Sequence, residues 1–268
     1  MNEITPAIQS DRTLIDPKEL DIYVPDSGLA IEYCGLYWHS EENGKDQWYH
    51  YNKWKECRES GVRLITVFED EDEDKVRSAI SAALGAREKG AFARKCAVRE
   101  VSTKAATAFL DKYHLQGSCG KRVSYGLYDG DELIAVMAFG QPSRQSEHAW
   151  ELRRFCTDGR THAGAASKLW KAFLREQQPE SVVSLSDRRW FTGEMYEKLG
   201  FVWDGEVKPD YAYVKNGERH HKSKFRKSGI ARHFPEIFVE DKTEREMMVE
   251  AGFGRIWDCG KDRWVWKK

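Results

Sequence analysis

The sequence lacks any apolar run that approaches the roughly 20 residues needed for a membrane-spanning helix. Its first residues, MNEITPAIQSDR, also lack the basic start and apolar centre of a secretory signal peptide. Internal repeats and low-complexity linkers are missing as well. We therefore expect a soluble, intracellular protein of the cytoplasm that engages no membrane. The sequence indicates no particular oligomeric state.

The six cysteines form neither a CxxC pair nor a tight cluster with histidines along the sequence. Structural zinc sites and disulfide frameworks usually show such spacing, so its absence argues against both. Reduced thiols, as in the cytosol, are the default expectation. The cysteines are Cys34, Cys57, Cys96, Cys119, Cys156 and Cys259.

Charge is nearly balanced, with a formal net charge of −1 although 32% of the residues are charged. One stretch departs from this balance, because cationic residues gather between positions 215 and 232 with a single acid, Glu218. Such a stripe can follow the phosphates of double-stranded DNA, and a solvated charged surface explains it equally well. Its cationic members are Lys215, Arg219, Lys222, Lys224, Arg226, Lys227 and Arg232.

The periodicity of apolar residues predicts an α/β protein with two domains, and 268 residues suffice for two ordinary cores. Residues 1–18 are polar and are predicted to form a loose arm. Residues 19–90 form the first domain, which ends in a charged stretch with glycines. Residues 91–214 form a second, mixed α/β domain. Residues 215–268 comprise the basic segment and a tail.

Short β-branched runs and helical spacing predict the individual elements. In the first domain we expect strands at 20–24, 29–34 and 62–68, and helices at 48–60 and 72–84. The acids at 69–74 fit the start of the second helix. In the second domain we expect strands at 124–128, 133–139, 152–156 and 182–186, with helices at 103–113, 167–176 and 192–199. The tail should contain a helix at 244–250 and a hairpin at 257–266.

The first two strands bring two carboxylates together. If Pro25–Gly28 is the loop, Val24 faces Leu29. Counting outward, Asp21 then faces Glu32, with Cβ atoms roughly 4.5–5.5 Å apart. Like charges placed opposite one another destabilise a hairpin, so the pair favours a bound Mg²⁺, which prefers carboxylate oxygens. Alternatively both acids lie on a solvated face, because a register slip of one residue separates them.

Two histidines follow the second strand. His39 ends the segment that leaves the strand near the same edge, and His50 begins the next helix. Imidazoles beside a carboxylate pair suit proton transfer or stabilisation of a leaving group at a phosphodiester. Each histidine alone is more often a polar surface residue or a satisfied core residue.

Three segments of the first domain resemble very-short-patch-repair (Vsr) endonucleases: LDIYVP (20–25), AIEYCGLYWH (30–39) and GVRLITVFE (61–69). The likeness is closest to the Vsr-like homing endonucleases of phages and covers about residues 15–85. It implies a nuclease core of the PD-(D/E)xK type, acting inside a phage-infected bacterium. It also implies that Asp21 binds Mg²⁺ and that His39 acts at the scissile phosphate. Cys34 stands where the family carries a second catalytic histidine.

In the second domain, the segment MYEKLGF (195–201) resembles the late tyrosine-bearing motif of GNAT acyltransferases. A strand, a small-residue loop and a helix start at 152–169 can cradle a phosphate with backbone N–H groups. That phosphate could belong to acyl coenzyme A or to DNA, or the loop merely packs tightly. The companion domain of phage Vsr-like nucleases looks similar, which favours target binding. Nearby arginines could add phosphate contacts: Arg153, Arg154, Arg188 and Arg189.

The leading hypothesis is therefore a Mg²⁺-dependent, site-directed DNA endonuclease. Asp21 and Glu32 would hold the metal, and His39 and His50 would assist hydrolysis. The four arginines and the cationic segment 215–227 would contact DNA. Two alternatives stay open. One is a GNAT-type acyltransferase, including one that acts on nucleic acid, with a degenerate nuclease domain. The other is a DNA-binding protein without catalysis.

Overall fold

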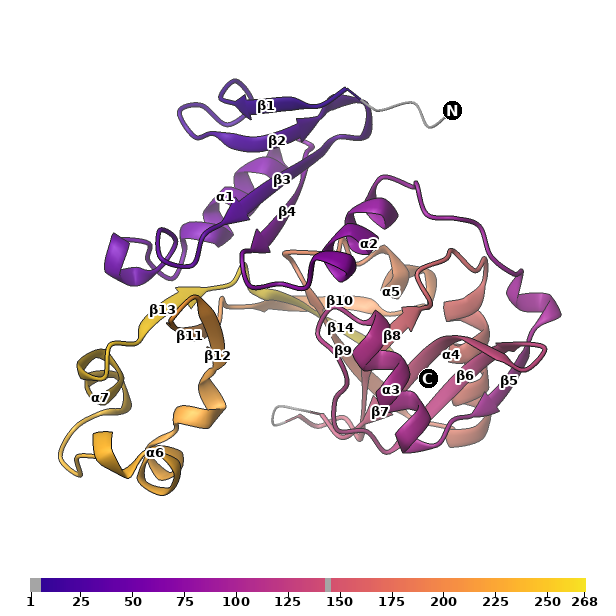
Figure 1. Ribbon diagram of the computed structural model, residues 1–268. Helices are drawn as coiled ribbons and strands as arrows, with labels where there is room; N and C mark the ends of the chain where they lie inside the picture. Colours follow the sequence, from indigo (N-terminus) through magenta and orange to yellow (C-terminus); the bar gives the residue numbers. More distant parts are fainter. Residues whose placement is uncertain (1–5, 143–145) are drawn as a thin grey trace. The chain divides into compact units, whose positions relative to one another are not determined.

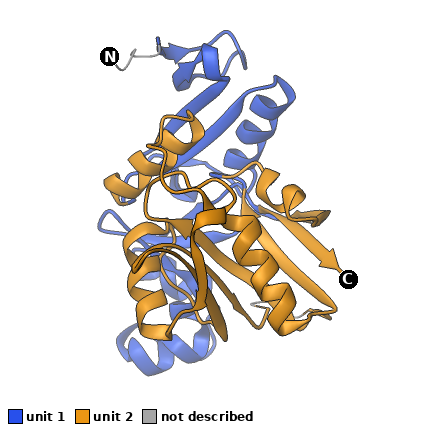
Figure 2. Cartoon of the chain, turned by 90° about the vertical axis from the view of Figure 1, so that its right-hand side faces the viewer, with its two compact units in different colours: residues 1–71, 188–190, 208–260 blue, residues 72–187, 191–207, 261–268 orange. Residues whose placement is uncertain are grey.

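The computed structural model describes residues 6–142 and 146–268, which form two compact units (Figure 2). The first unit comprises residues 1–71, 188–190 and 208–260, and the second comprises residues 72–187, 191–207 and 261–268. Both combine helices with sheets, which confirms the predicted α/β class. No helix within the described ranges is long and apolar enough to cross a bilayer.

The first unit contains a four-stranded sheet in the order β1-β2-β3-β4. Its strands are β1 (Ile8–Asp11), β2 (Leu20–Val24), β3 (Leu29–Cys34) and β4 (Arg63–Phe68). The first two pairings are antiparallel, and β3 pairs with β4 in parallel. Residues 8–11 belong to the segment expected to be a loose arm, so that expectation was wrong for β1.

The β2–β3 hairpin has the predicted register, with Val24 opposite Leu29. Its loop is the short 3₁₀ helix Pro25–Ser27, followed by Gly28 with φ of 58°, a value that glycine adopts without steric cost. Helix α1 (Tyr49–Glu59) then links β3 to β4 as the crossover that parallel strands require. Trp54 and Cys57 of α1 pack against the sheet in a buried apolar cluster.

A second, smaller sheet of the first unit has the order β12-β11-β13. It consists of β11 (Tyr211–Lys215), β12 (Glu218–His221) and β13 (Gly254–Trp257). Helices α6 (Lys227–His233) and α7 (Glu244–Glu250) accompany it, around a core that includes Tyr213, Phe225 and Met248. A capping box between Thr243 and Glu246 begins α7.

The second unit is a seven-stranded sheet in the order β10-β14-β9-β8-β7-β6-β5 (Figure 1). Its pairings are antiparallel except that of β8 with β9. The strands are β5 (Ala97–Glu100), β6 (Val123–Asp129), β7 (Glu132–Gly140), β8 (Trp150–Thr157), β9 (Ser181–Asp187), β10 (Val202–Val207) and β14 (Lys261–Lys267). The helices are α2 (Glu73–Ala83), α3 (Thr103–Tyr113), α4 (Ala165–Gln177) and α5 (Glu194–Lys198).

Helices α3 and α4 cover opposite faces of this sheet, because alternate residues of β7 join different cores. Phe139 packs with Phe173 of α4, and their parallel rings have centroids 3.6 Å apart. Val136 and Ala138 instead pack with Leu110 of α3. This alternation is the two-residue period of a strand that is buried on both faces.

The predicted hairpin at 257–266 is wrong. Strand β13 pairs with β11, whereas β14 pairs with β9 and β10 in a different sheet. The chain thus leaves the large sheet after β10, builds residues 208–260 into the first unit, and returns as β14. Helix α2, which we expected in the first domain, belongs to the second unit, with Asp72 as the cap that accepts a hydrogen bond from the Lys75 N–H.

Candidate functional site

Glu32 of β3 forms a buried ion pair with Lys53 of α1 in the first unit. The Lys53 Nζ lies 2.5 Å from the Glu32 Oε1, and the two side chains are 8% and 7% exposed. Burial raises the pKa of Glu32, while the charge of Lys53 opposes that shift and the charge of Asp21 adds to it. Lys53 is therefore the cation that balances this carboxylate.

Asp21 is engaged in a different way. Its Oδ2 accepts a hydrogen bond of 2.7 Å from the backbone N–H of Tyr33. The pairing of Ile22 with Ile31 agrees with the expected register, which places Asp21 beside Glu32 at the next position outward. The carboxylates thus come close as expected, and Lys53 forms its ion pair with one of them, Glu32.

The sequence did not predict Lys53 as a site residue, although its position in α1 indicates burial. It lies three residues after His50 and four before Cys57, so helical spacing puts it on the buried side of α1. A lysine on the apolar side of a helix requires a partner, because an isolated buried charge is costly. The acid on the neighbouring strand supplies it.

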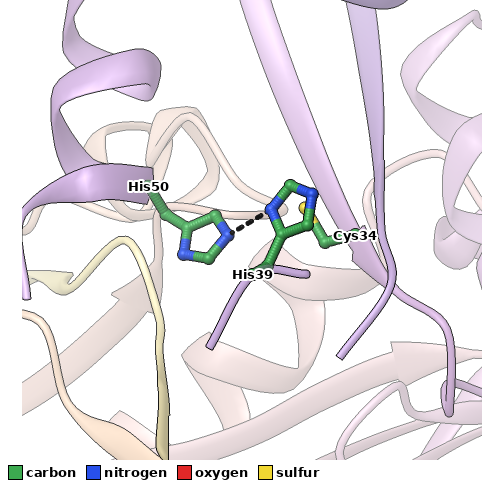
Figure 3. A group of neighbouring side chains, drawn as sticks. All are labelled: Cys34, His39 and His50. Atoms are coloured by element: carbon green, nitrogen blue, oxygen red, sulfur yellow. Dashed lines mark hydrogen bonds between the residues drawn. The ribbon is translucent and has the colours of Figure 1, made fainter. Parts of the chain in front are cut away.

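The histidines meet at the end of β3 together with Cys34 (Figure 3). The Nδ1 of His39 lies 3.2 Å from the Nε2 of His50, and one ligand atom from each of the three residues lies within 4.8 Å of the others. Sequence spacing argued against a metal site with cysteine, yet a strand, a turn and a helix bring one cysteine to two histidines.

Backbone geometry fixes this cluster. The N–H of His39 donates to the carbonyl of Gly35, which closes the turn after β3. His50 lies in the first turn of α1, and its ring packs edge-on against Phe68 of β4. Cys34, His50 and Phe68 are buried, whereas His39 is half-buried.

Burial governs the protonation of all three groups. It lowers the pKa of His39 to about 4, helped by the charges of Lys45 and Lys53. It lowers the pKa of His50 to about 3, helped by His39 and partly opposed by the backbone of Trp257. Burial also raises the pKa of Cys34 well above its usual value. At neutral pH both imidazoles are therefore uncharged.

Most of the cationic segment is engaged within the first unit. The guanidinium of Arg219 contacts Asp70 at 2.6 Å and Glu71 at 3.2 Å. Lys222 forms an ion pair with Asp210. These contacts neutralise charges that were expected to face phosphates.

Lys215 and Lys227 donate to main-chain carbonyls, those of Ala251 and Glu240. Lys224 and Arg226 are exposed. A role of this segment in binding double-stranded DNA stays a prediction, with Lys224 and Arg226 as its best-placed members.

The four arginines also make internal contacts. Arg188 is 1% exposed and lies over the ring of Trp54, and Arg189 pairs with Glu71 at 2.9 Å. In the second unit, Arg153 and Arg154 donate to carbonyls of the loop before β6. Neither buried arginine presents its guanidinium to a phosphate backbone.

The second unit contains a different candidate site, where two parallel strands separate. Strand β8 pairs with β9 through three residue pairs, the last being Leu152 with Ser184. Both strands continue beyond that pair, to Thr157 and Asp187, without pairing with each other, while β8 still pairs with β7 and β9 with β14. Arg153 is the extra residue of a bulge against β7, which bends β8 at the point of separation.

A loop leads from β8 into helix α4 beside this opening. Gly164 is the N-cap of α4 with φ of 83°, a conformation that favours glycine. The N–H groups of Ala163, Gly164, Ala166 and Ser167 donate no hydrogen bond to any other residue in the described part of the chain. Such a row of N–H groups at a helix start attracts an anion.

Ion pairs centred on Asp158 stabilise the remainder of the loop. The Nε2 of His162 lies 2.9 Å from Asp158, and Arg160 also pairs with Asp158 and with Glu132. Hydrogen bonds from Arg160 and His162 lower the pKa of Asp158 although its burial works against them. Arg160 is thereby directed toward acids rather than toward a ligand at α4.

Tyr196 of α5 reaches the point where β8 and β9 separate. Ser184 Oγ lies 2.7 Å from the carbonyl of Leu152 and 2.9 Å from the hydroxyl of Tyr196. Ser184 has a single hydroxyl proton and the carbonyl can only accept, so Ser184 donates to Leu152 and Tyr196 donates to Ser184. Burial raises the pKa of Tyr196, which keeps its phenol protonated.

No protein-family model and no curated protein sequence matches this chain. Among solved structures, an acetyltransferase from Bacillus subtilis in complex with CoA matches at 14% identity over 65% of this chain and 99% of its own, with a TM-score of 0.35. A GNAT family acetyltransferase from Elizabethkingia anophelis with acetyl-CoA bound matches at 12% identity over the same shares, with a TM-score of 0.33. A putative streptothricin acetyltransferase from Bacillus anthracis in complex with acetyl coenzyme A matches at 11% identity over 65% and 99%, with a TM-score of 0.36.

The prediction of a Vsr-like, Mg²⁺-dependent DNA endonuclease is wrong. The solved structures named above are acetyltransferases, and none is a nuclease. The physical reason lies at the carboxylate pair, where the charge that Mg²⁺ was expected to neutralise is balanced by Lys53. The repulsion between Asp21 and Glu32 therefore needs no metal ion.

Proposed function

We propose that the second unit is an acyltransferase domain of the GNAT type that uses acyl coenzyme A. The observation that carries this proposal is the separation of β8 from β9 directly beside unpaired N–H groups at the start of α4. The opening and the anion-binding groups thus adjoin, as a ligand with an extended chain and a diphosphate requires.

Each part of that ligand has a matching feature. A diphosphate can accept hydrogen bonds from the N–H groups of Ala163, Gly164, Ala166 and Ser167. The amide-bearing arm of coenzyme A can lie along β8 past Leu152, where pairing with β9 ends, in the way that a peptide adds to a strand edge. The thioester would then approach Tyr196.

The reaction needs one proton donor on the protein. An acceptor amine attacks the thioester carbonyl, a C–N bond forms, the C–S bond breaks, and the departing thiolate takes a proton. Tyr196 is protonated and its hydroxyl is fixed by Ser184, so it is suited to supply that proton. The amine loses its own proton to solvent or buffer in this scheme.

The test is the binding of acetyl coenzyme A to the full chain, measured by calorimetry. Ser167→Asp places a carboxylate among the N–H groups, so we expect at least about tenfold weaker binding from charge repulsion. The same change favours the helix, since acids stabilise its first turn. Binding therefore falls without loss of thermal stability.

Ser167→Ala is the matched control and should bind as the unaltered chain does, because the exposed Ser167 hydroxyl has no hydrogen bond within the described residues. The proposal fails if the unaltered chain shows no saturable binding at millimolar acetyl coenzyme A. It fails equally if Ser167→Asp and Ser167→Ala bind alike.

A further inference from the structure

We propose that Cys34, His39 and His50 of the first unit bind a soft divalent metal ion, with Zn²⁺ as the best fit. One sulfur and two nitrogen atoms from these residues lie within 4.8 Å of one another (Figure 3). They come from the end of β3, the turn that follows it and the first turn of α1. This site is independent of the acyltransferase proposal, which concerns the second unit.

The distance between the two imidazoles agrees with shared coordination. With Zn–N bonds of about 2.0–2.1 Å, two nitrogen ligands of a tetrahedral ion are about 3.3 Å apart. The Nδ1 of His39 and the Nε2 of His50 are 3.2 Å apart. A direct hydrogen bond gives a similar distance, so the neighbouring sulfur is the observation that points to a metal.

The chemistry of the donors selects the ion. Thiolate and imidazole ligands suit Zn²⁺, whereas Mg²⁺ prefers oxygen. Of the nearby carboxylates, Glu32 pairs with Lys53 through Oε1 while its buried Oε2 has no hydrogen-bond partner among the described residues, and Asp21 accepts a backbone N–H through Oδ2. Cys34 is 0% exposed, and its thiol makes no hydrogen bond with any described residue.

The two ring nitrogens that face one another are the ones placed to ligate, the Nδ1 of His39 and the Nε2 of His50. The other ring nitrogen of His50, Nδ1, is buried and has no hydrogen-bond partner among the described residues.

Three protein ligands leave one position of a tetrahedron for water or another small ligand. Of the three residues, Cys34 and His50 are buried and His39 is half-buried, so His39 is the ligand that solvent reaches. The cluster thus has the donor count of an open zinc site rather than that of a closed structural one.

The experiment titrates Co²⁺ into the full chain after treatment with a chelator. We expect one equivalent to bind with a near-ultraviolet thiolate-to-cobalt charge-transfer band, and Zn²⁺ to displace it. Cys34→Ser should lose that band and bind metal at least about tenfold more weakly, and His39→Ala should weaken binding to a similar extent.

Cys57→Ser is the matched control, because Cys57 is another buried thiol of the first unit that lies outside the cluster. This variant should keep both the band and the affinity. The proposal is overturned if the unaltered chain binds no Co²⁺ at micromolar concentration, or if Cys34→Ser keeps the band. Should Cys34→Ser fail to fold, an undiminished affinity in His39→Ala, altered at a half-buried turn, overturns it as well.

Discussion

The Nζ of Lys53 lies 2.5 Å from the Oε1 of Glu32, and both side chains are more than nine-tenths buried. A helix and a strand thus share one internal charge pair, in the place where an external cation was expected. Breaking such a pair from one side leaves a buried charge without compensation.

Lys53→Met should therefore lower the free energy of unfolding by about 3–5 kcal/mol. Urea unfolding followed by circular dichroism measures it. Lys55→Met is the control on the same helix, because Lys55 is 53% exposed and its contact with Glu59 is long, at 3.8 Å. That change should cost about 0–1 kcal/mol. Equal losses in both variants would contradict a stabilising role for the buried pair.

The double variant Lys53→Met, Glu32→Gln separates charge from packing. Removing both charges should restore a large part of the lost stability, because no uncompensated carboxylate remains. A double variant as unstable as Lys53→Met alone would show that the loss arises from packing.

Gly90→Ala should destabilise the second unit. A Cβ at Gly90 would lie 2.3 Å from the Cε1 of His162, far inside contact distance, so the ring that pairs with Asp158 must move. We expect a loss of about 1–3 kcal/mol, as for other overpacked cores. Gly120→Ala is the control, since its Cβ would meet Arg153 at an ordinary 3.6 Å. Equal melting temperatures of Gly90→Ala and Gly120→Ala would contradict the predicted clash with His162.

The half-buried His114 should make the stability of the second unit depend on pH. Burial lowers its pKa to about 3, with the charges of Arg154 and Lys75 adding to the shift. Between about pH 6.5 and pH 3 the unfolded chain binds this proton and the folded chain does not. The contribution of His114 to the free energy of unfolding is therefore fully present above about pH 6.5 and is lost progressively as the pH falls toward about 3.

His114→Asn should flatten that decline between pH 6 and about pH 4 in urea unfolding, since the titrating group is gone. His233→Asn changes an exposed position of α6 and should leave the pH dependence of the free energy of unfolding unchanged. An unchanged slope in His114→Asn would mean that other groups cause the acid sensitivity.

Tyr196→Phe tests the proton donor of the proposed transfer. It should lower kcat by about 10²-fold or more while KM for acetyl coenzyme A changes little, because the ring and its packing remain. Tyr125→Phe removes another hydroxyl of the same unit, one that accepts from Gln177 at 3.0 Å, and should leave kcat unchanged. An undiminished kcat in Tyr196→Phe would remove the phenol from the mechanism.

Local patterns predicted the local structure well. The strands at 20–24 and 29–34 and the helix at 103–113 have the expected bounds, because turn residues and apolar spacing act over a few positions. The register of the first hairpin followed for the same reason, since a tight loop fixes which residues face one another.

The remaining features depend on partners that are distant in the sequence. Strand β14 pairs with β10 across the inserted residues 208–260, and nothing within 257–266 distinguishes that pairing from a hairpin. The site shows the same limit. Cys34 and His39 became neighbours of His50 through the β3–α1 connection, and Lys53 found Glu32 through helix packing.

The position of β14 constrains the order in which the second unit can form. Residues 261–267 lie between β10 and β9, so the large sheet has a gap next to β9 until they arrive. During synthesis the ribosome makes the whole of 208–260 after β10 and before this strand. The edge of β9 thus stays open throughout that interval, and completion of the sheet must wait until the 261–267 segment has emerged.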